Sequence, residues 1–262
     1  MDSFSLDGKR ALVCGASRGI GRAIAETFAQ AGARVFLLAR QKERLQEICE
    51  NLNANKSDCA SYIAADLDEP ESFLKMVRQE IEDQGPFHIL VNNAGGPPGG
   101  PIIEASPEAF ESAFRRHVVA SHLLLQTILP GMKAAQYGRV INIISTSVRE
   151  PIANLGVSNT IRGAMASWAK SCAKELPPKI TVNNILPGFT DTERLDALRE
   201  GAAQRMGTSP EAVQEKWMGM VPEKRLGTPD ELAHAALFLA SPAGNFVRGV
   251  SLAVDGGRMA SI

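Results

Sequence analysis

The chain has 262 residues, of which 44% are hydrophobic and 22% are charged, and its formal net charge at pH 7 is −1. This length is enough for one large α/β domain with a fully buried sheet, while the balanced charge argues against nucleic acid and anionic membranes as partners. The four cysteines form no C-x-x-C pair and are expected to be free thiols in a reducing compartment. With no signal-peptide pattern and no apolar run of membrane-spanning length, the sequence predicts a cytoplasmic protein.

Apolar runs typical of strands alternate with amphipathic segments typical of helices along the whole chain. Strands are expected over residues 11–14, 34–39, 61–65, 88–91, 139–144, 179–186 and 250–254. Helices are expected from residue 20 and over residues 41–53, 70–83, 107–135, 157–176 and 229–240, with a disturbance near Pro130. This alternation predicts a single-domain, doubly wound Rossmann fold over residues 1–262, with a mostly parallel seven-stranded sheet and helices on both faces. Residues 190–222 are polar and partly helical, and are expected to be an insertion that lines a substrate pocket.

The first expected strand leads into a glycine-rich turn, and residues 10–21 read RALVCGASRGIG. Strand, glycine turn and helix N-terminus in this order build a site for a pyrophosphate, because free N–H groups and the positive end of the helix dipole face the anion. Gly15 would form the tight turn, Gly19 would allow close approach of the ligand, and Gly21 would allow helix–strand contact. The turn therefore predicts a dinucleotide cofactor.

The end of the second expected strand selects between the two nicotinamide cofactors. An acid there would bind the 2′-hydroxyl of NAD, whereas an arginine favours the 2′-phosphate of NADP. This chain has Ala39-Arg40 at that point and a second cation, Arg18, inside the glycine turn. Two guanidiniums could form charge-assisted bonds with the extra phosphate, so the sequence predicts NADP(H).

The glycine spacing, G-x-x-x-G-x-G, resembles that of the short-chain dehydrogenase/reductase family, although Cys14 replaces the family's usual threonine. Further motifs extend the resemblance over nearly the whole chain: Asp66-Leu67, Asn92-Asn93-Ala94-Gly95, Pro187-Gly188 with Thr190 and Thr192, and Val254 to Gly257. The branch it is most similar to is the 3-oxoacyl-[acyl-carrier-protein] reductases. The resemblance implies the following cofactor-binding residues: Gly15, Ser17, Arg18, Gly19, Ile20, Gly21, Arg40, Asp66, Leu67, Asn93, Ala94, Gly95, Pro187, Gly188, Thr190 and Thr192.

The family's catalytic residues are a serine, a tyrosine, a lysine four residues later, and an asparagine on the preceding helix. Ser145 occupies the serine position, but Ser158, Arg162 and His117 stand at the other three. A serine hydroxyl cannot be made as acidic as a tuned tyrosine, and an arginine can hold an oxyanion but cannot pass on a proton. His117 could donate protons, directly or through water. Its spacing to the next histidine on the helix argues against a metal site.

Two functions of different class remain open from the sequence. The first is an NADP(H)-dependent reductase of a ketone or 3-oxoacyl group that uses Ser145, Ser158, Arg162 and His117 in an altered relay. The second is a non-catalytic NADP(H)-binding sensor or partner subunit, in which the two serines cap backbone groups and Arg162 sits in a salt bridge. A weaker third is a non-redox reaction on an acidic substrate held by Arg162.

A homo-oligomer is also expected from the apolar surplus on the helices over residues 107–135 and 157–176. The surplus side chains are Leu123, Leu124, Leu125, Ile128, Met165 and Trp168.

Overall fold

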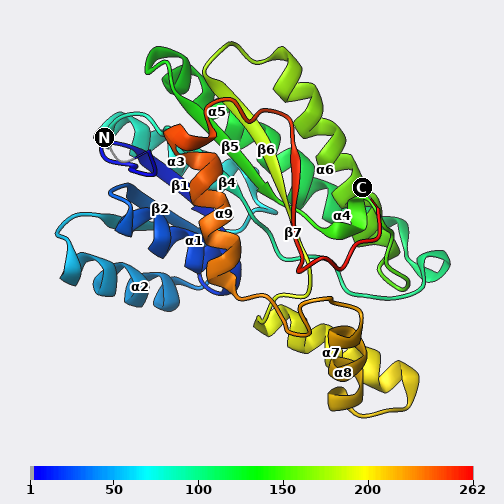
Figure 1. Ribbon diagram of the computed structural model, residues 1–262. Coiled ribbons are helices and arrows are strands. Elements are labelled where there is room, and N and C mark those ends of the chain that lie inside the picture. Colours follow the sequence, from blue (N-terminus) through cyan, green and yellow to red (C-terminus); the bar gives the residue numbers. More distant parts are fainter. Residues whose placement is uncertain (1–2, 262) are drawn as a thin grey trace.

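The computed structural model describes residues 3–261, so the first two residues and the last residue of the predicted 1–262 domain lie outside the described part. Seven parallel strands form one sheet in the order β3-β2-β1-β4-β5-β6-β7 (Figure 1). The strands are β1 (Arg10–Cys14), β2 (Arg34–Ala39), β3 (Ala60–Ala64), β4 (Ile89–Asn92), β5 (Gly138–Ile143), β6 (Ile180–Pro187) and β7 (Ser251–Val254). All seven predicted strands are confirmed, and the sheet is parallel throughout.

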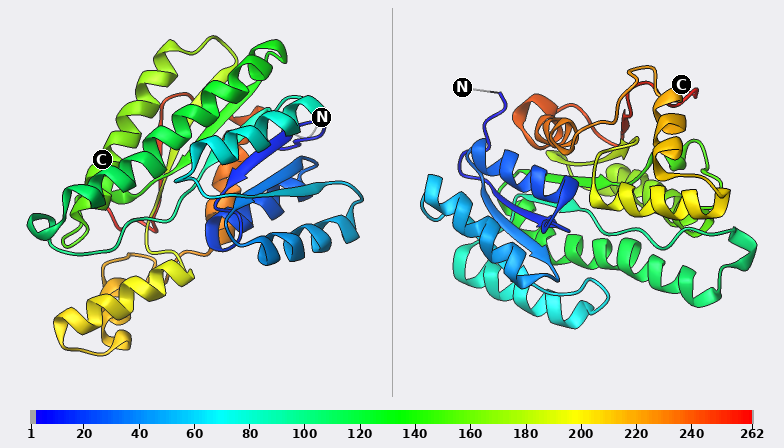
Figure 2. Two further views of the ribbon diagram at one scale, coloured as in Figure 1. Left: turned by 180° about the vertical axis from the view of Figure 1, so that it is seen from behind. Right: turned by 90° about the horizontal axis from the view of Figure 1, so that it is seen from below.

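Helices cover both faces of the sheet (Figures 1 and 2). One face carries α1 (Gly19–Gln30), α2 (Lys42–Asn55) and α9 (Pro229–Ala240), and the other carries α3 (Pro70–Gln84), α5 (Ala120–Ala134) and α6 (Gly156–Glu175). Alternate side chains of each strand serve the two faces, so Val13 and Val91 pack under α1 while Leu12 and Leu90 pack on the opposite side. The predicted doubly wound Rossmann architecture is thus confirmed.

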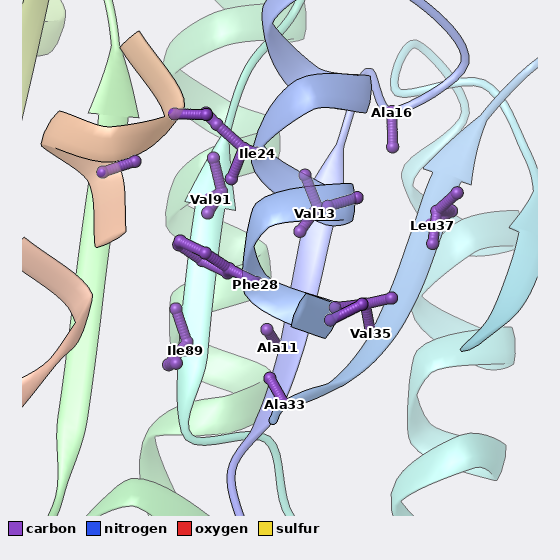
Figure 3. Packing of buried hydrophobic residues seen from close by; sticks show 14 of the residues in the cluster. Ala11, Val13, Ala16, Ile24, Phe28, Ala33, Val35, Leu37, Ile89 and Val91 are labelled. Atoms are coloured by element: carbon purple, nitrogen blue, oxygen red, sulfur yellow. The ribbon is translucent and has the colours of Figure 1, made fainter. Parts of the chain in front are cut away.

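Helix α1 is anchored so that its first turn meets the carboxyl ends of the central strands. Figure 3 shows Phe28 and Ile24 of α1 lying over Val91, with Ile89 and Val13 beside them. Phe28 and Ile24 are fully buried, and burying side chains of this size stabilises the fold by roughly 1.5–3 kcal/mol each. The packing therefore fixes the N-terminus of α1 directly beside the glycine turn that follows β1.

The helix expected over residues 107–135 is divided, and the predicted disturbance near Pro130 is wrong. The structure has α4 (Pro107–Phe114), a π-helical turn η2 (Arg115–Val119) and then α5, with Pro130 inside α5. The turn is π-helical because the Ala120 N–H donates to the carbonyl of Arg115, five residues earlier in the chain. This turn carries His117 into the interior of the protein.

Residues 190–222 form two helices, α7 (Glu193–Met206) and α8 (Pro210–Gly219), beyond the carboxyl ends of the strands (Figure 1, yellow). Thr192 caps α7 and Ser209 caps α8, each accepting a hydrogen bond from a backbone N–H three residues later. Short 3-10 turns complete the fold: η1 (Ile102–Glu104), η3 (Thr146–Val148) and η4 (Pro242–Gly244).

Most of the apolar side chains that suggested an oligomer are used inside the chain. Leu124, Leu125, Ile128 and Met165 are buried in the core, which leaves only Leu123 and Trp168 of that set partly exposed. The expected surplus is therefore smaller than the sequence suggests. Among the helices of residues 3–261, none combines the length and apolar character needed to cross a membrane.

Candidate active site

A cavity of about 900 Å³ opens at the carboxyl end of the sheet. It extends from the turn between β1 and α1 to the inner surfaces of α7 and α8. Strand order reverses between β1 and β4, and ligands of doubly wound sheets bind outside the strand ends at such a switch point. Every residue predicted to bind the cofactor lines this cavity except Gly21, which lies beneath the turn.

The glycine turn is closely packed and has no room for side chains. Gly15 and Gly19 have φ of 61° and 54°, the left-handed region that favours glycine. A β-carbon on Gly21 would lie 2.3 Å from the carbonyl oxygen of Gly15. The amide of Asn93 braces the turn, because its Nδ2 donates to the carbonyls of Cys14 and Gly15, both at 3.3 Å. The turn thus holds the α1 N-terminus open toward the cavity.

The cations predicted to select NADP(H) flank one end of the cavity, and each is paired with a carboxylate. Arg40 lies 3.5 Å from Asp66 and keeps 71% of its side chain exposed. Arg18, at the start of α1, pairs with Glu193 of α7, which also contacts Arg44 at 3.0 Å. The two guanidiniums lower the pKa of the Glu193 carboxyl. Glu193 thereby links α7 to the glycine turn.

Ser145, Ser158 and Arg162 come together in the same cavity. Ser145 follows β5 by two residues and caps η3, where its hydroxyl accepts a hydrogen bond from the N–H of Ser147 at 3.0 Å. Ser158 lies one helical turn before Arg162 on α6. The guanidinium of Arg162 is buried and donates to the carbonyls of Ile143 at 2.8 Å and Ala94 at 3.3 Å. It pairs with no carboxylate within residues 3–261, so the salt-bridge interpretation is not supported.

Burial, together with the smaller effect of the nearby charge of Arg194, lowers the pKa of Arg162 to about 10. Because this value lies well above neutrality, the side chain remains a cation at pH 7. A fixed cation beside two hydroxyls is an arrangement that stabilises negative charge developing on a carbonyl oxygen.

The structure does not bring His117 into the cavity with the two serines. Its side chain is 4% exposed and lines a separate small cavity beneath, one wall of which is Arg162. Burial, followed by the charges of Arg162 and Arg116, lowers the pKa of His117 to about 2, despite a hydrogen bond to the Gly95 backbone. The imidazole is therefore neutral at pH 7, and this corrects the expectation that it serves as a proton donor.

Neither tyrosine replaces the missing acid. Tyr62 lies within β3. Tyr137 directly precedes β5, at the end of the sheet opposite the cavity, and its hydroxyl donates to the carbonyl of Ala240. Neither residue lines the cavity.

Four aromatic and cationic side chains of the cavity, those of Arg194, Phe189, Trp217 and Arg258, were not identified by the sequence analysis. Arg194 donates to the carbonyl of Pro97 at 2.7 Å, and Phe189 stacks on Trp217 with ring centroids 4.9 Å apart. A fourth residue, Arg258, lies 4.7 Å from the Phe189 ring centroid. Phe189 and Arg194 flank the Thr190–Thr192 motif, which was the available signal, whereas Trp217 carries none.

Residues 15–258 match the family model described as enoyl-(acyl carrier protein) reductase. The chain belongs to the short-chain dehydrogenase/reductase family. An uncharacterised oxidoreductase of Mycobacterium tuberculosis is 36% identical, covering 98% of this chain and 94% of that protein. The 3-oxoacyl-[acyl-carrier-protein] reductase of Vibrio cholerae is 34% identical, covering 97% and 98%.

Among solved structures, L-sorbose reductase of Gluconobacter frateurii, crystallised with NADPH and L-sorbose, superposes with a TM-score of 0.92. It is 30% identical in sequence and the match covers 99% of this chain and 100% of that one. Membership of the family makes the chain a homologue of oxidoreductases.

Proposed function

We propose that the chain is an NADP(H)-dependent reductase of a ketone or 3-oxoacyl group, working as one domain with residues 190–222 as its substrate loop. The observation that carries the proposal is the continuity of the site. One cavity joins the glycine turn and the Pro187–Thr192 segment to Ser145, Ser158 and Arg162. We refer to the part of this cavity lined by Ser145, Ser158, Arg162, Arg194 and Arg258 as the substrate end.

The residues at the other end fit a dinucleotide. The N-terminus of α1 offers backbone N–H groups to a pyrophosphate, while Gly15 and Gly19, which have no side chains, leave the approach to it open. Ala39 leaves room for the 2′-phosphate beside Arg18 and Arg40. Bound NADPH would supply a hydride to the carbonyl carbon. L-sorbose reductase, similar over its full length, was crystallised with NADPH.

At the substrate end, the chain's own groups would act on the carbonyl oxygen. The Ser145 and Ser158 hydroxyls donate hydrogen bonds to it, and the fixed charge of Arg162 stabilises the alkoxide that develops when the carbon accepts the hydride. Arg162 keeps its proton throughout, because its pKa of about 10 leaves no neutral form to exchange at pH 7. Since His117 lies outside the cavity, water supplies the proton that completes the alcohol.

The test is NADPH oxidation by purified protein with a panel of ketones and 3-oxoacyl thioesters, followed by nicotinamide absorbance. Turnover with at least one class supports the proposal. Loss of a positioned general acid costs ~10²–10⁴-fold, so slow rates are expected. Tight NADPH binding without turnover on any substrate would instead support the sensor or partner-subunit function, which the absence of a tyrosine at position 158 favours.

Preference for NADPH over NADH by several-fold or more is expected from Arg18 and Arg40. Arg40→Asp should invert the preference, because a carboxylate at that point repels the 2′-phosphate and accepts a hydrogen bond from the ribose 2′-hydroxyl. Calorimetric titration of parent and variant with both nucleotides measures this. Lys42→Asp, which changes the charge by the same amount at an exposed residue of α2 outside the cavity, is the control. Equal affinities of the parent for the two nucleotides would contradict the assignment.

A homo-oligomer is also expected, although fewer of the apolar side chains that suggested it from the sequence are exposed. Large apolar side chains remain exposed at Ile102 (55%), Ile103 (92%) and Phe246 (103%), and Leu123 and Trp168 are partly exposed. Light scattering at micromolar concentration should give a mass above that of one chain, and a monomer would remove the idea.

A further inference from the structure

Cations gather at the substrate end without carboxylates to balance them. Asp66 and Glu193 are the acids that line the cavity within the described residues, and both are held at the cofactor end by Arg40, Arg18 and Arg44. The guanidiniums of the substrate end, on Arg162, Arg194 and Arg258, form no ion pair within residues 3–261, although the charge of Arg258 contributes to lowering the pKa of the Glu150 carboxyl outside the cavity. An anion from outside the chain would balance them.

Two of these guanidiniums converge on one point beside the Ser158 hydroxyl. A β-carbon placed on Gly96 would lie 3.4 Å from Nη2 of Arg194, 3.7 Å from Nη2 of Arg162 and 3.9 Å from Oγ of Ser158. Arg194 reaches this point from the first turn of α7 and is held there by its bond to the Pro97 carbonyl. A ligand at this point would contact the Ser158 hydroxyl and both guanidiniums at once. A substrate with a carbonyl next to an anionic group needs such a combination.

The arrangement costs stability in the absence of an anion. Burial and the charge of Arg18 lower the pKa of Arg194, and the pKa of Arg162 is lowered in turn by burial and by Arg194. The positive charge of a neighbouring arginine therefore disfavours the protonated form of each guanidinium. Arg194 also lies in the first turn of a helix, where the dipole favours negative rather than positive charge. An incoming carboxylate would relieve both effects.

Arg258 supplies a third, independent cation. It donates to Oγ1 of Thr146, the neighbour of Ser145, at 2.9 Å, and its Nε is buried without a partner. Its guanidinium is held over Phe189, which in turn stacks on Trp217. The wall formed by α7, α8 and the residue after α8 is mostly apolar, with Leu195, Leu198, Val213 and Met220, and it also carries the cations Arg205 and Lys216. The cavity therefore offers cations near the reacting hydroxyls and an apolar surface further out.

We infer that the substrate is an oxo acid, with a carboxylate close to the reacting carbonyl and an apolar body, and that Arg194 is the residue that recognises the carboxylate. Planar guanidiniums match a carboxylate through paired hydrogen bonds, which a neutral ester cannot accept with the same strength. The inference deepens the proposed function and rests on it for the reduction itself. The reaction it specifies is hydride transfer from NADPH to the carbonyl carbon, with a proton from water to the oxygen, giving the hydroxy acid and NADP⁺.

The experiment compares 2-oxo and 3-oxo acids of increasing chain length with their methyl esters. The parent should favour the acid by at least ~10-fold in kcat/KM, and Arg194→Met should lower kcat/KM for the acid by roughly 10- to 100-fold while changing that for the ester by less than about 3-fold. Arg194→Lys should restore part of the acid preference, because it keeps the charge but not the fork. Arg78→Met, the same change at an exposed arginine on α3 that does not line the cavity, should leave the preference within about 3-fold.

Binding separates this inference from the proposed reaction. Calorimetry on the complex with NADP⁺ should show the acid binding more tightly than the ester, and Arg194→Met should remove the difference even if no substrate is reduced. If the acid binds more tightly than the ester and Arg194→Met removes the difference, but no substrate is reduced, the reductase proposal is overturned and the oxo-acid site is supported. Equal binding of acid and ester by the parent would overturn the inference. The inference would also be overturned if Arg194→Met lowered the affinity for NADPH enough to explain the whole kinetic effect. Arg194 would then be a cofactor-binding residue.

Discussion

Turnover of a small ketone should rise by at least ~10-fold when Ser158→Tyr is combined with Arg162→Lys. Both positions line the cavity beside Ser145, so the new phenol would face the same carbonyl oxygen as the present hydroxyl. A phenol next to a cation can be tuned toward neutral pH, and a positioned general acid contributes ~10²–10⁴-fold, of which we expect the low end. NADPH oxidation under saturating cofactor measures the gain.

The arginine explains why both changes are needed. The guanidinium of Arg162 donates hydrogen bonds to the carbonyls of Ile143 and Ala94. It is therefore fixed in place, and it cannot pass a proton to a phenol. Ser158→Tyr alone should therefore gain less than the double variant. Replacing the fork by an ammonium gives up at least one of those two bonds, and a loss of about 1–2 kcal/mol in unfolding free energy is expected. Cofactor binding and thermal unfolding must show that the double variant is folded. If it binds NADPH but is no faster than the parent, position 158 is not a vacated acid site.

The sheet and the cofactor end of the cavity were predictable from local patterns. Each buried parallel strand is an apolar run of its own, and the alternation with helices fixes the doubly wound arrangement. The glycine turn is likewise local, because the residues that form it, Gly15 to Gly21, are neighbours in sequence. Gly15 and Gly19 adopt left-handed φ angles, which glycine permits at no steric cost, so residue type and spacing were enough to predict the turn.

The substrate end was less predictable, because its contacts join distant segments. Arg194 reaches the carbonyl of Pro97 across 97 residues, and the nearby Thr190–Thr192 motif does not show which cavity wall the arginine joins. His117 was identified by counting back from Pro130, but a sequence count cannot show that a π-helical turn rotates the residue inward. A side chain expected in the cavity therefore lies below it, with Arg162 between the two.

His117→Asn should make the protein more tolerant of acid. The pKa of His117 is about 2 in the fold, against an ordinary value of 6.5, so the unfolded chain takes up a proton that the folded chain refuses. The contribution of this residue to stability is complete above about pH 6.5 and is lost progressively as the pH falls from there toward 2. Linkage gives ~1.4 kcal/mol per pH unit over that window, or ~2 kcal/mol by about pH 5. The cause is burial and the neighbouring charges, which the asparagine amide avoids because it does not titrate.

Chemical unfolding of the parent and the variant across this pH range gives the measurement. At about pH 7.5 the asparagine should be no better than neutral, because it leaves a small cavity and only removes an imidazole whose Nε2 has no partner. The difference in unfolding free energy should then move by ~2 kcal/mol in favour of the variant by about pH 5. Carboxylates that drive acid unfolding are common to both proteins and cancel in the difference. His234→Asn, which removes an exposed imidazole from α9, should give a flat difference curve. A flat curve for His117→Asn would mean that the imidazole reaches water in solution, and would return it to the list of possible proton donors.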